Sequence, residues 1–186
     1  MKRLFDVLLA LTLILIFTVP MLFIALVIKL TSAGPVLYWS ERMGGNNTIF
    51  KMPKFRTMKL DTPTVATHLL KNPDQYLTPI GKFLRRYSLD ELPQLFSVLK
   101  GDMSFVGPRP ALFNQDDLIE LRIQKGVHIL VPGITGWAQI NGRDDLPIPL
   151  KVELDEYYLK HRSFFFDLKT LFLTFFNVLS SKGVKH

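Results

Sequence analysis

The chain contains 186 residues, of which 48% are apolar, and it carries a formal net charge of +7. This length allows one domain with a membrane element and is short for two globular domains. Apolar and basic character together favour a protein on an anionic membrane surface, or one that handles anionic substrates, over a freely soluble domain. The chain has no cysteine, which excludes disulfides and thiolate metal sites, and its four histidines form no metal-ligand pattern.

The first element is an apolar segment. Residues 7–28 contain no charged side chain and are long enough for a membrane helix. Lys2 and Arg3 precede the segment and Lys29 follows it, so the positive-inside rule draws both ends to the cytoplasmic side. Pro20 removes a helical hydrogen bond and bends a helix. A bent helix that enters and leaves by the same face satisfies both observations, and a single span that tolerates the proline is the alternative.

A β-hairpin is predicted next. Residues 36–39 and 49–52 have strand character, and they flank a turn at 41–47 that is rich in glycine and asparagine. Lys54 and Arg56 follow at alternating positions, so on an extended segment they share a face and can hold phosphates or lipid headgroups. The alternative for these two cations is an ordinary solvated edge.

Two adjacent carboxylates, Asp90 and Glu91, are the main candidates for chemistry. Pro93 fits a helix only in its first turn, so a helix is predicted from near Asp90 to about residues 100–101. Its buried face is expected to comprise Leu92, Leu95, Phe96 and Leu99. An acidic pair on such a held element can serve catalysis. The alternative is helix capping, because Ser88 and Glu91 fit the capping-box pattern and Asp90 alone can be an N-cap.

Two later loops add candidate binding residues. Arg109 lies between two prolines, so little backbone entropy is lost when its guanidinium binds an oxyanion; an arginine in a surface turn is the alternative. The segment 132–143 is dense in glycine, which lets a backbone approach a ligand closely. Gln139, Asn141 and Arg143 can then reach that ligand, although a structural hairpin would have the same composition.

The C-terminal part is predicted to contain a helix over about residues 164–180. Its polar positions step by three or four and form one narrow stripe, comprising Asp167, Thr170, Thr174, Asn177 and Ser181. Such a helix lies in the membrane interface or packs against the first segment. Together these patterns predict a mostly helical α+β fold, with a membrane-embedded helix at 1–30, re-entrant or spanning, and a small cytosolic domain at 31–186.

Several motifs occur in a fixed order. They are Lys54-Phe55-Arg56-Thr57-Met58, Ser88-Leu89-Asp90-Glu91-Leu92-Pro93-Gln94-Leu95, Gly101-Asp102-Met103-Ser104, Gly107-Pro108-Arg109-Pro110 and Pro132-Gly133-Ile134-Thr135-Gly136-Trp137. This series closely resembles the bacterial sugar transferases, the monotopic polyprenol-phosphate phosphoglycosyl transferases, and in length it resembles their small catalytic form. Family members usually carry Ser-Pro at the helix break, whereas here Thr18-Val19-Pro20 places the proline one residue later, which leaves the bend angle open.

The resemblance implies transfer of a phospho-sugar from a UDP-sugar to undecaprenyl phosphate with release of UMP, as the first membrane step of glycan assembly. It also implies a re-entrant helix, dependence on Mg²⁺, and a place for Asp155 in the site. The expected location is the cytoplasmic face of the bacterial inner membrane. Phospholipid and downstream glycosyltransferases are the expected partners, a homodimer is left open, and no nucleic acid is expected.

Chemistry assigns the roles in this hypothesis. Attack on a pyrophosphate requires its negative charge to be offset, so Glu91, with Asp90, is expected to bind the metal, and Arg109 to stabilise the phosphate. Lys54 and Arg56 are the expected second anion contact. Asp90 is expected to attack the sugar-bearing phosphorus in a ping-pong scheme through an acyl phosphate. Direct transfer in a ternary complex is one alternative, and a membrane-anchored module that binds anions or nucleic acid is another.

Overall fold

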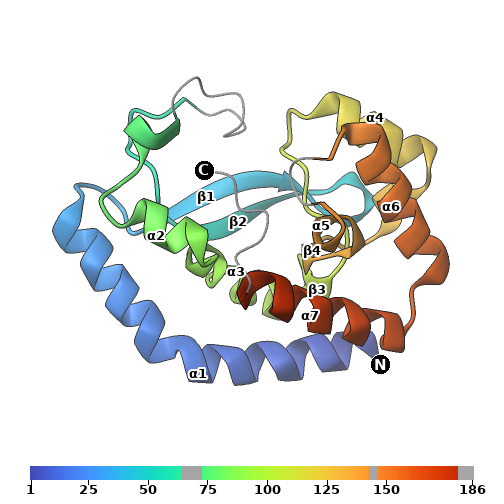
Figure 1. Cartoon of the computed structure of the whole chain (residues 1–186), viewed down its shortest axis with the longest axis horizontal. Helices are drawn as coiled ribbons and strands as arrows, with labels where there is room; N and C mark the ends of the chain where they lie inside the picture. Colours follow the sequence, from blue (N-terminus) through green and yellow to red (C-terminus); the bar gives the residue numbers. More distant parts are fainter. Residues whose placement is uncertain (64–72, 143–145, 180–186) are drawn as a thin grey trace.

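The computed structural model describes residues 1–63, 73–142 and 146–179. The fold is mostly helical with small two-stranded sheets, as the sequence predicts (Figure 1). The α-helices are α1 (Lys2–Thr31), α2 (Gly81–Arg86), α3 (Gln94–Lys100), α4 (Asp116–Gln124), α5 (Trp137–Ile140), α6 (Ile148–His161) and α7 (Phe164–Leu179). The strands are β1 (Leu37–Met43), β2 (Ile49–Phe55), β3 (Ser104–Val106) and β4 (Gly133–Thr135). Short 3₁₀ turns are η1 (Gly45–Asn47), η3 (Pro73–Tyr76), η4 (Leu89–Glu91) and η5 (Val127–Ile129).

Helix α1 is long, unbroken and bent, and the other elements lie on its concave side (Figure 1). Its length and composition would allow it to cross a membrane, with a mean hydropathy of 2.9 over its most apolar window. The bend has a local cause, because Pro20 lacks the N–H that would bond the carbonyl of Ile16. Thr18 also donates its hydroxyl to the carbonyl of Ile14 at 2.7 Å, a bond that often accompanies helix bending.

Both ends of α1 are attached to the same body of structure. Near its start, Arg3 donates to two carbonyls in the last turn of α3. Asp6, one turn further on, is buried and accepts the hydroxyl of Ser104 at 2.8 Å. Near its end, Ile24 is buried in a cluster that includes Leu84 of α2. The intervening turns expose a series of large apolar side chains, comprising Leu11, Leu15, Ile16, Val19, Leu22, Phe23 and Leu26.

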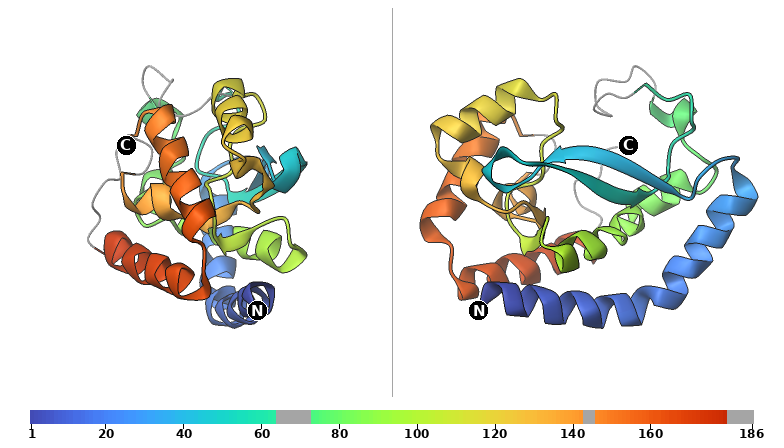
Figure 2. Two further views of the ribbon diagram at one scale, coloured as in Figure 1. Left: turned by 90° about the vertical axis from the view of Figure 1, so that its right-hand side faces the viewer. Right: turned by 180° about the vertical axis from the view of Figure 1, so that it is seen from behind.

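Strands β1 and β2 form the predicted hairpin. They pair antiparallel, with Tyr38 opposite Lys54 and Arg42 opposite Phe50. Figure 2, right, shows this long ribbon running from the end of α1 to the side of the molecule where α4 and α6 lie. Phe50 and Met52 of β2 are buried in the main core together with residues of α1, α3, β3 and α6. The hairpin therefore connects the two sides of the molecule.

The glycine-dense segment after residue 132 does not form the structural hairpin that was one alternative for its composition. β4 pairs in parallel with β3, so it is not half of a hairpin. A Cβ atom on Gly133 would lie 2.2 Å from the backbone nitrogen of Gly107, and one on Gly136 would lie 2.1 Å from the carbonyl oxygen of Gly107. These glycines are therefore required for close approach to another part of the backbone, and the motif positions the chain that follows Gly107.

Helix α7 turns its polar stripe inward. Asp167 and Thr170 are buried, and Thr174 shares a hydrogen bond of 2.7 Å with Thr135. The outward face is apolar and includes Phe165, Phe172, Phe175 and Phe176. α7 lies against the first turns of α1, where Lys2 forms a 2.5 Å ion pair with Asp167 (Figures 1 and 2). The expected contact between this helix and the first segment is confirmed; Ser181 lies outside the described residues.

Candidate active site

The acidic pair lies on the 3₁₀ turn η4 and not in the first turn of a longer helix. α3 begins only at Gln94, because Pro93 has no N–H with which to bond the carbonyl of Leu89. Ser88 precedes the turn with a φ of 54° and makes no side-chain capping bond. The predicted helix start near Asp90 is therefore one turn too early. The predicted end is confirmed, since Gly101 adopts a left-handed φ of 100° after Lys100.

Glu91 lies between two cations from distant parts of the chain. Its Oε1 atom accepts a bond of 2.8 Å from Lys54 Nζ and one of 3.2 Å from Arg109 Nη2. Burial raises the pKa of Glu91, but these two cations outweigh it and hold the pKa well below its ordinary value. The carboxylate is thus ionised at every physiological pH, and it is engaged in ion pairing and not in a capping box.

Asp90 has a different environment although it is the next residue. Its side chain is buried, and no hydrogen bond to its carboxylate occurs within the described residues. Burial raises the pKa of Asp90 to about 6, and the charge of Glu91 adds to the rise. Lys54, Arg85 and Arg109 oppose it. The Asp90 carboxylate therefore has free lone pairs, and its ionised form is less stable than that of an ordinary aspartate. This combination suits a nucleophile.

The loop that carries Arg109 is held by hydrogen bonds that its backbone carbonyl groups accept. Four consecutive carbonyls, from Pro108 to Ala111, each accept a hydrogen bond. Gly133 N–H donates to Pro108 and Met43 N–H to Ala111. Side chains donate to the two carbonyls between these. Arg122 donates to the Arg109 carbonyl at 2.9 Å, and Arg42 donates to the Pro110 carbonyl at 3.2 Å. The loop backbone is thus fixed and its one long side chain extends to Glu91.

Asp155 is linked to the acidic pair through two other residues, Arg122 and Arg109. It is buried on α6 and accepts two bonds from Arg122 of α4, at 2.6 and 3.1 Å. Burial raises the pKa of Asp155, and Arg122 opposes that rise. Since Arg122 also holds the Arg109 carbonyl, Asp155 supports the loop from behind. A buried arginine at the apolar phase of a helix, one turn after buried Leu118, is a signal that the sequence contained.

The structure separates the other predicted residues. Arg56 is buried and donates to the backbone carbonyls of Ser32 and Ala33 and to the Ser32 hydroxyl, so it binds the chain that leaves α1 and not Glu91. Both amide atoms of Gln139 are buried without a partner within the described residues. Arg143 lies outside the described residues. In contrast, sequence reasoning did not select Arg85, which lies close enough to Asp90 to affect its pKa.

Asp90 and Glu91 are the residues that can hold a cation here. No group of three or more histidine, aspartate or glutamate side chains with metal-site geometry occurs in the described part of the chain. Magnesium often takes one or two protein carboxylates and completes its shell with phosphate oxygens and water. Two adjacent carboxylates therefore fit a magnesium ion that arrives with a phosphorylated substrate better than a closed structural site.

Comparison with known proteins agrees with this arrangement. The family model described as bacterial sugar transferase matches residues 1–181, which include all of the residues above. The chain belongs to the bacterial sugar transferase family. It is 44% identical to the uncharacterised sugar transferase EpsL of Bacillus subtilis, over 100% of this chain and 90% of EpsL.

Relatives of this sugar transferase include proteins whose names state a reaction. It is 43% identical to the UDP-glucose:undecaprenyl-phosphate glucose-1-phosphate transferase of Escherichia coli, over 98% of this chain but 41% of that enzyme. It is 38% identical to the exopolysaccharide production protein ExoY of Rhizobium meliloti, over 98% of this chain and 87% of ExoY. The chain thus spans most of two relatives and less than half of the E. coli enzyme.

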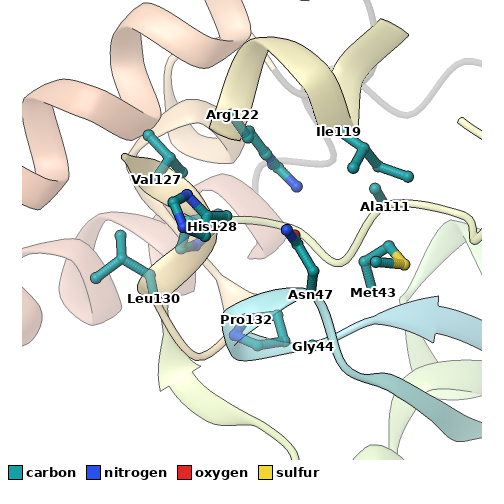
Figure 3. Close-up of a pocket in the computed structure, with 11 residues that line it drawn as sticks. Met43, Gly44, Asn47, Ala111, Ile119, Arg122, Val127, His128, Leu130 and Pro132 are labelled. Atoms are coloured by element: carbon teal, nitrogen blue, oxygen red, sulfur yellow. The ribbon is translucent and has the colours of Figure 1, made fainter. Parts of the chain in front are cut away.

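A small cavity lies behind the Arg109 loop of this sugar transferase. Figure 3 shows the side chains of Arg122, His128 and Asn47 around it. Its volume is about 30 Å³, which is room for a water molecule, whereas ligand pockets have volumes of several hundred Å³. The Nδ1 atom of His128 is buried without a hydrogen-bond partner in the described residues, as expected beside a water site. The cavity is too small for a nucleotide sugar, so it does not compete with the acidic pair as the substrate site.

Proposed function

We propose that this sugar transferase moves a phospho-sugar from a UDP-sugar to undecaprenyl phosphate and releases UMP. The observation that carries the proposal is the difference in environment between two adjacent carboxylates. Glu91 is bound by two cations, whereas Asp90 is buried with its pKa raised and accepts no hydrogen bond within the described residues. Family membership and the names of the relatives support the same reaction class.

In the first proposed step, an Asp90 oxygen attacks the sugar-bearing phosphorus. A bond forms between the carboxylate and phosphorus, the bridging P–O bond breaks, and UMP leaves with that electron pair. In the second step, a phosphate oxygen of undecaprenyl phosphate attacks the same phosphorus and Asp90 leaves as a carboxylate. Each step transfers the same phospho-sugar group, breaks one P–O bond for the one that forms, and needs no redox partner.

The cations around Glu91 have a defined task in both steps. Phosphoryl transfer depends mainly on positioning and on offsetting the charge of the phosphate oxygens. Arg109 and Lys54 lie within hydrogen-bond distance of one carboxylate oxygen, so both can turn to a phosphate group that enters beside Glu91. Mg²⁺, held by Asp90 and Glu91, would supply further charge neutralisation of the pyrophosphate.

We also propose that α1 enters and leaves the inner membrane by its cytoplasmic face. Both ends of the helix contact the same body of structure, which argues against placing them on opposite sides of a bilayer. The apolar outward face of α7 lies next to the start of α1 and fits the same interface. Because the chain has no cysteine, single cysteines before Lys2 and at Thr31 give a clean test. Both should react with an impermeant maleimide in inside-out vesicles only; opposite accessibility would indicate a span.

Intact mass tests the reaction. Purified protein is incubated with Mg²⁺ and a panel of UDP-hexoses and UDP-N-acetylhexosamines, without lipid acceptor, and UMP release is recorded in parallel. The expected result is a mass increase of one phospho-sugar that is absent in Asp90→Asn. Turnover with undecaprenyl phosphate but no adduct with any donor would instead favour direct transfer in a ternary complex. No turnover with any donor would contradict the proposal.

A further inference from the structure

The two cations that contact Glu91 are both attached to the β1–β2 hairpin, one as part of a strand and one through a neighbouring backbone bridge. Lys54 belongs to β2 itself. Arg109 does not, but the chain that follows it runs along the edge of β1, where Arg42 forms an antiparallel bridge with Leu112. Tyr38, which pairs with Lys54, lies four residues before Arg42, so the two attachment points are about 14 Å apart along the strand at about 3.4 Å per residue. The hairpin therefore sets the spacing between the two cations.

Arg42 makes the side-chain contact at the second attachment point. Its Nη1 donates to the carbonyl of Pro110 at 3.2 Å, and its Nε donates to the hydroxyl of Ser40 at 2.9 Å. Ser40 is buried, so the base of the guanidinium is fixed to the strand. Proline has no N–H, so Pro108 and Pro110 cannot be held by donating to a neighbouring strand. Holding this loop depends instead on donors to its carbonyls, and Arg42 is one of two side chains that supply them.

We propose that Arg42 is a positioning residue for phosphoryl transfer, acting through the Pro110 carbonyl to keep Arg109 over Glu91. This inference rests on the proposed function for its kinetic consequence. Arg42 donates to Ser40 and to the Pro110 carbonyl, whereas the donors that contact Glu91 are Lys54 and Arg109. An effect that passes through the Pro110 carbonyl depends on Arg109, and this makes a prediction that a purely structural role does not share.

Arg122, the other side chain that donates to a carbonyl of this loop, is less suitable for a test than Arg42. Arg122 holds the neighbouring carbonyl but is buried in an ion pair with Asp155, so its removal leaves an uncompensated buried carboxylate and endangers folding. Arg42 is only half-buried. Arg42→Ala should therefore fold, and Arg42→Lys retains a cation that can reach one of the two acceptors but not both.

A double-mutant cycle decides the matter. Single-turnover rates of adduct formation are measured for wild type, Arg42→Ala, Arg109→Ala and the double variant, with saturating UDP-sugar and Mg²⁺. A displacement of about 1 Å in a catalytic group can cost about 100-fold, so Arg42→Ala should lower the rate about 10- to 100-fold. In the Arg109→Ala background the same change should cost less than about twofold, because residues that act through one another are not additive. Arg42→Lys should recover part of the rate, and Lys51→Ala, which removes an exposed cation from β2, should have no effect.

Other outcomes would overturn the inference. An unchanged rate in Arg42→Ala, or an equal loss in both backgrounds, would show that Arg42 does not act through Arg109. If the wild type is inactive, the proposed function fails. Hydrogen exchange then tests separately whether Arg42 holds the loop through the Pro110 carbonyl. Arg42→Ala should speed exchange at the amides of Arg109, Ala111 and Leu112 while the hairpin stays protected. Unchanged exchange at these three amides would show that Arg42 does not hold the loop.

Discussion

Replacement of Asp90 by asparagine should stabilise the folded protein while it abolishes adduct formation. Burial raises the pKa of Asp90 from 3.8 to about 6. One pKa unit corresponds to about 1.4 kcal/mol, so ionised Asp90 destabilises the folded state by about 3 kcal/mol at neutral pH. Asparagine has nearly the same shape and cannot ionise. The variant should therefore be more stable by up to that amount, which corresponds to a Tm increase of about 6 to 12 °C for a chain of this size.

The pH dependence of this difference has a definite sign. A raised pKa means that the folded state binds the proton more tightly than the unfolded state, so the penalty is complete above pH 6 and disappears below pH 4. The Tm difference between Asp90→Asn and wild type should follow the same course. Thermal unfolding in one detergent, between pH 4 and pH 8, measures it.

The neighbouring carboxylate provides a matched control of opposite sign. Lys54 and Arg109 lower the pKa of Glu91 despite its burial, so its charge stabilises the folded state above its unfolded pKa and that stability is lost as pH falls. Glu91→Gln should therefore lower the Tm at neutral pH. Asp74→Asn removes an exposed carboxylate and should change the Tm little. A Tm for Asp90→Asn at or below that of wild type at pH 7.5, or an advantage that persists at pH 4, would refute the reasoning.

Three further results are expected. The single-turnover rate should fall with a one-proton dependence below about pH 6, because Asp90 must be ionised to attack; quenched-flow rates that stay constant to pH 5 would contradict this. Asp155→Asn should destabilise the fold by about 3 to 5 kcal/mol, since Arg122 is left without its counter-ion, and adding Arg122→Met should restore the Tm but not the rate. Lys2→Met should cost about 1 to 3 kcal/mol by leaving Asp167 without its cation, and pairing it with Asp167→Asn should recover most of the Tm.

The parts of the fold that the sequence predicted are those with local causes. A long run without charge indicated α1, and the glycine and asparagine turn between two aromatic segments indicated the β1–β2 hairpin. The polar stripe of α7 followed from helical spacing alone, although its inward direction did not. The acidic pair stood out because Pro93 fixed the helix start to within one turn of Asp90. Each of these signals lies within one continuous stretch of the chain.

The parts that the sequence did not predict depend on contacts between distant residues. Lys54 and Arg56 look equivalent as alternating cations, yet one bonds Glu91 and the other bonds the chain after α1. Their difference arises because α1 ends beside β2, which no local pattern states. Arg122 and Asp155 are 33 positions apart, and their pairing is visible only once α4 lies on α6. Resemblance placed Asp155 in the site, whereas its contacts place it behind the loop that carries Arg109.

The basic residues at the start of α1 have a second role that bears on where the reaction takes place. The positive-inside rule treats Lys2 and Arg3 as free charges near the lipid, but Lys2 pairs with Asp167 and Arg3 bonds two carbonyls at the end of α3. α3 begins three residues after Glu91, so the start of α1 and the acidic pair are attached to opposite ends of one short helix. If α1 lies in the bilayer as proposed, its depth therefore fixes the height of Asp90 above the lipid. A phosphate that is anchored by a polyprenol chain is confined to that height, which is why a short attachment between anchor and nucleophile suits the proposed reaction better than a flexible linker would.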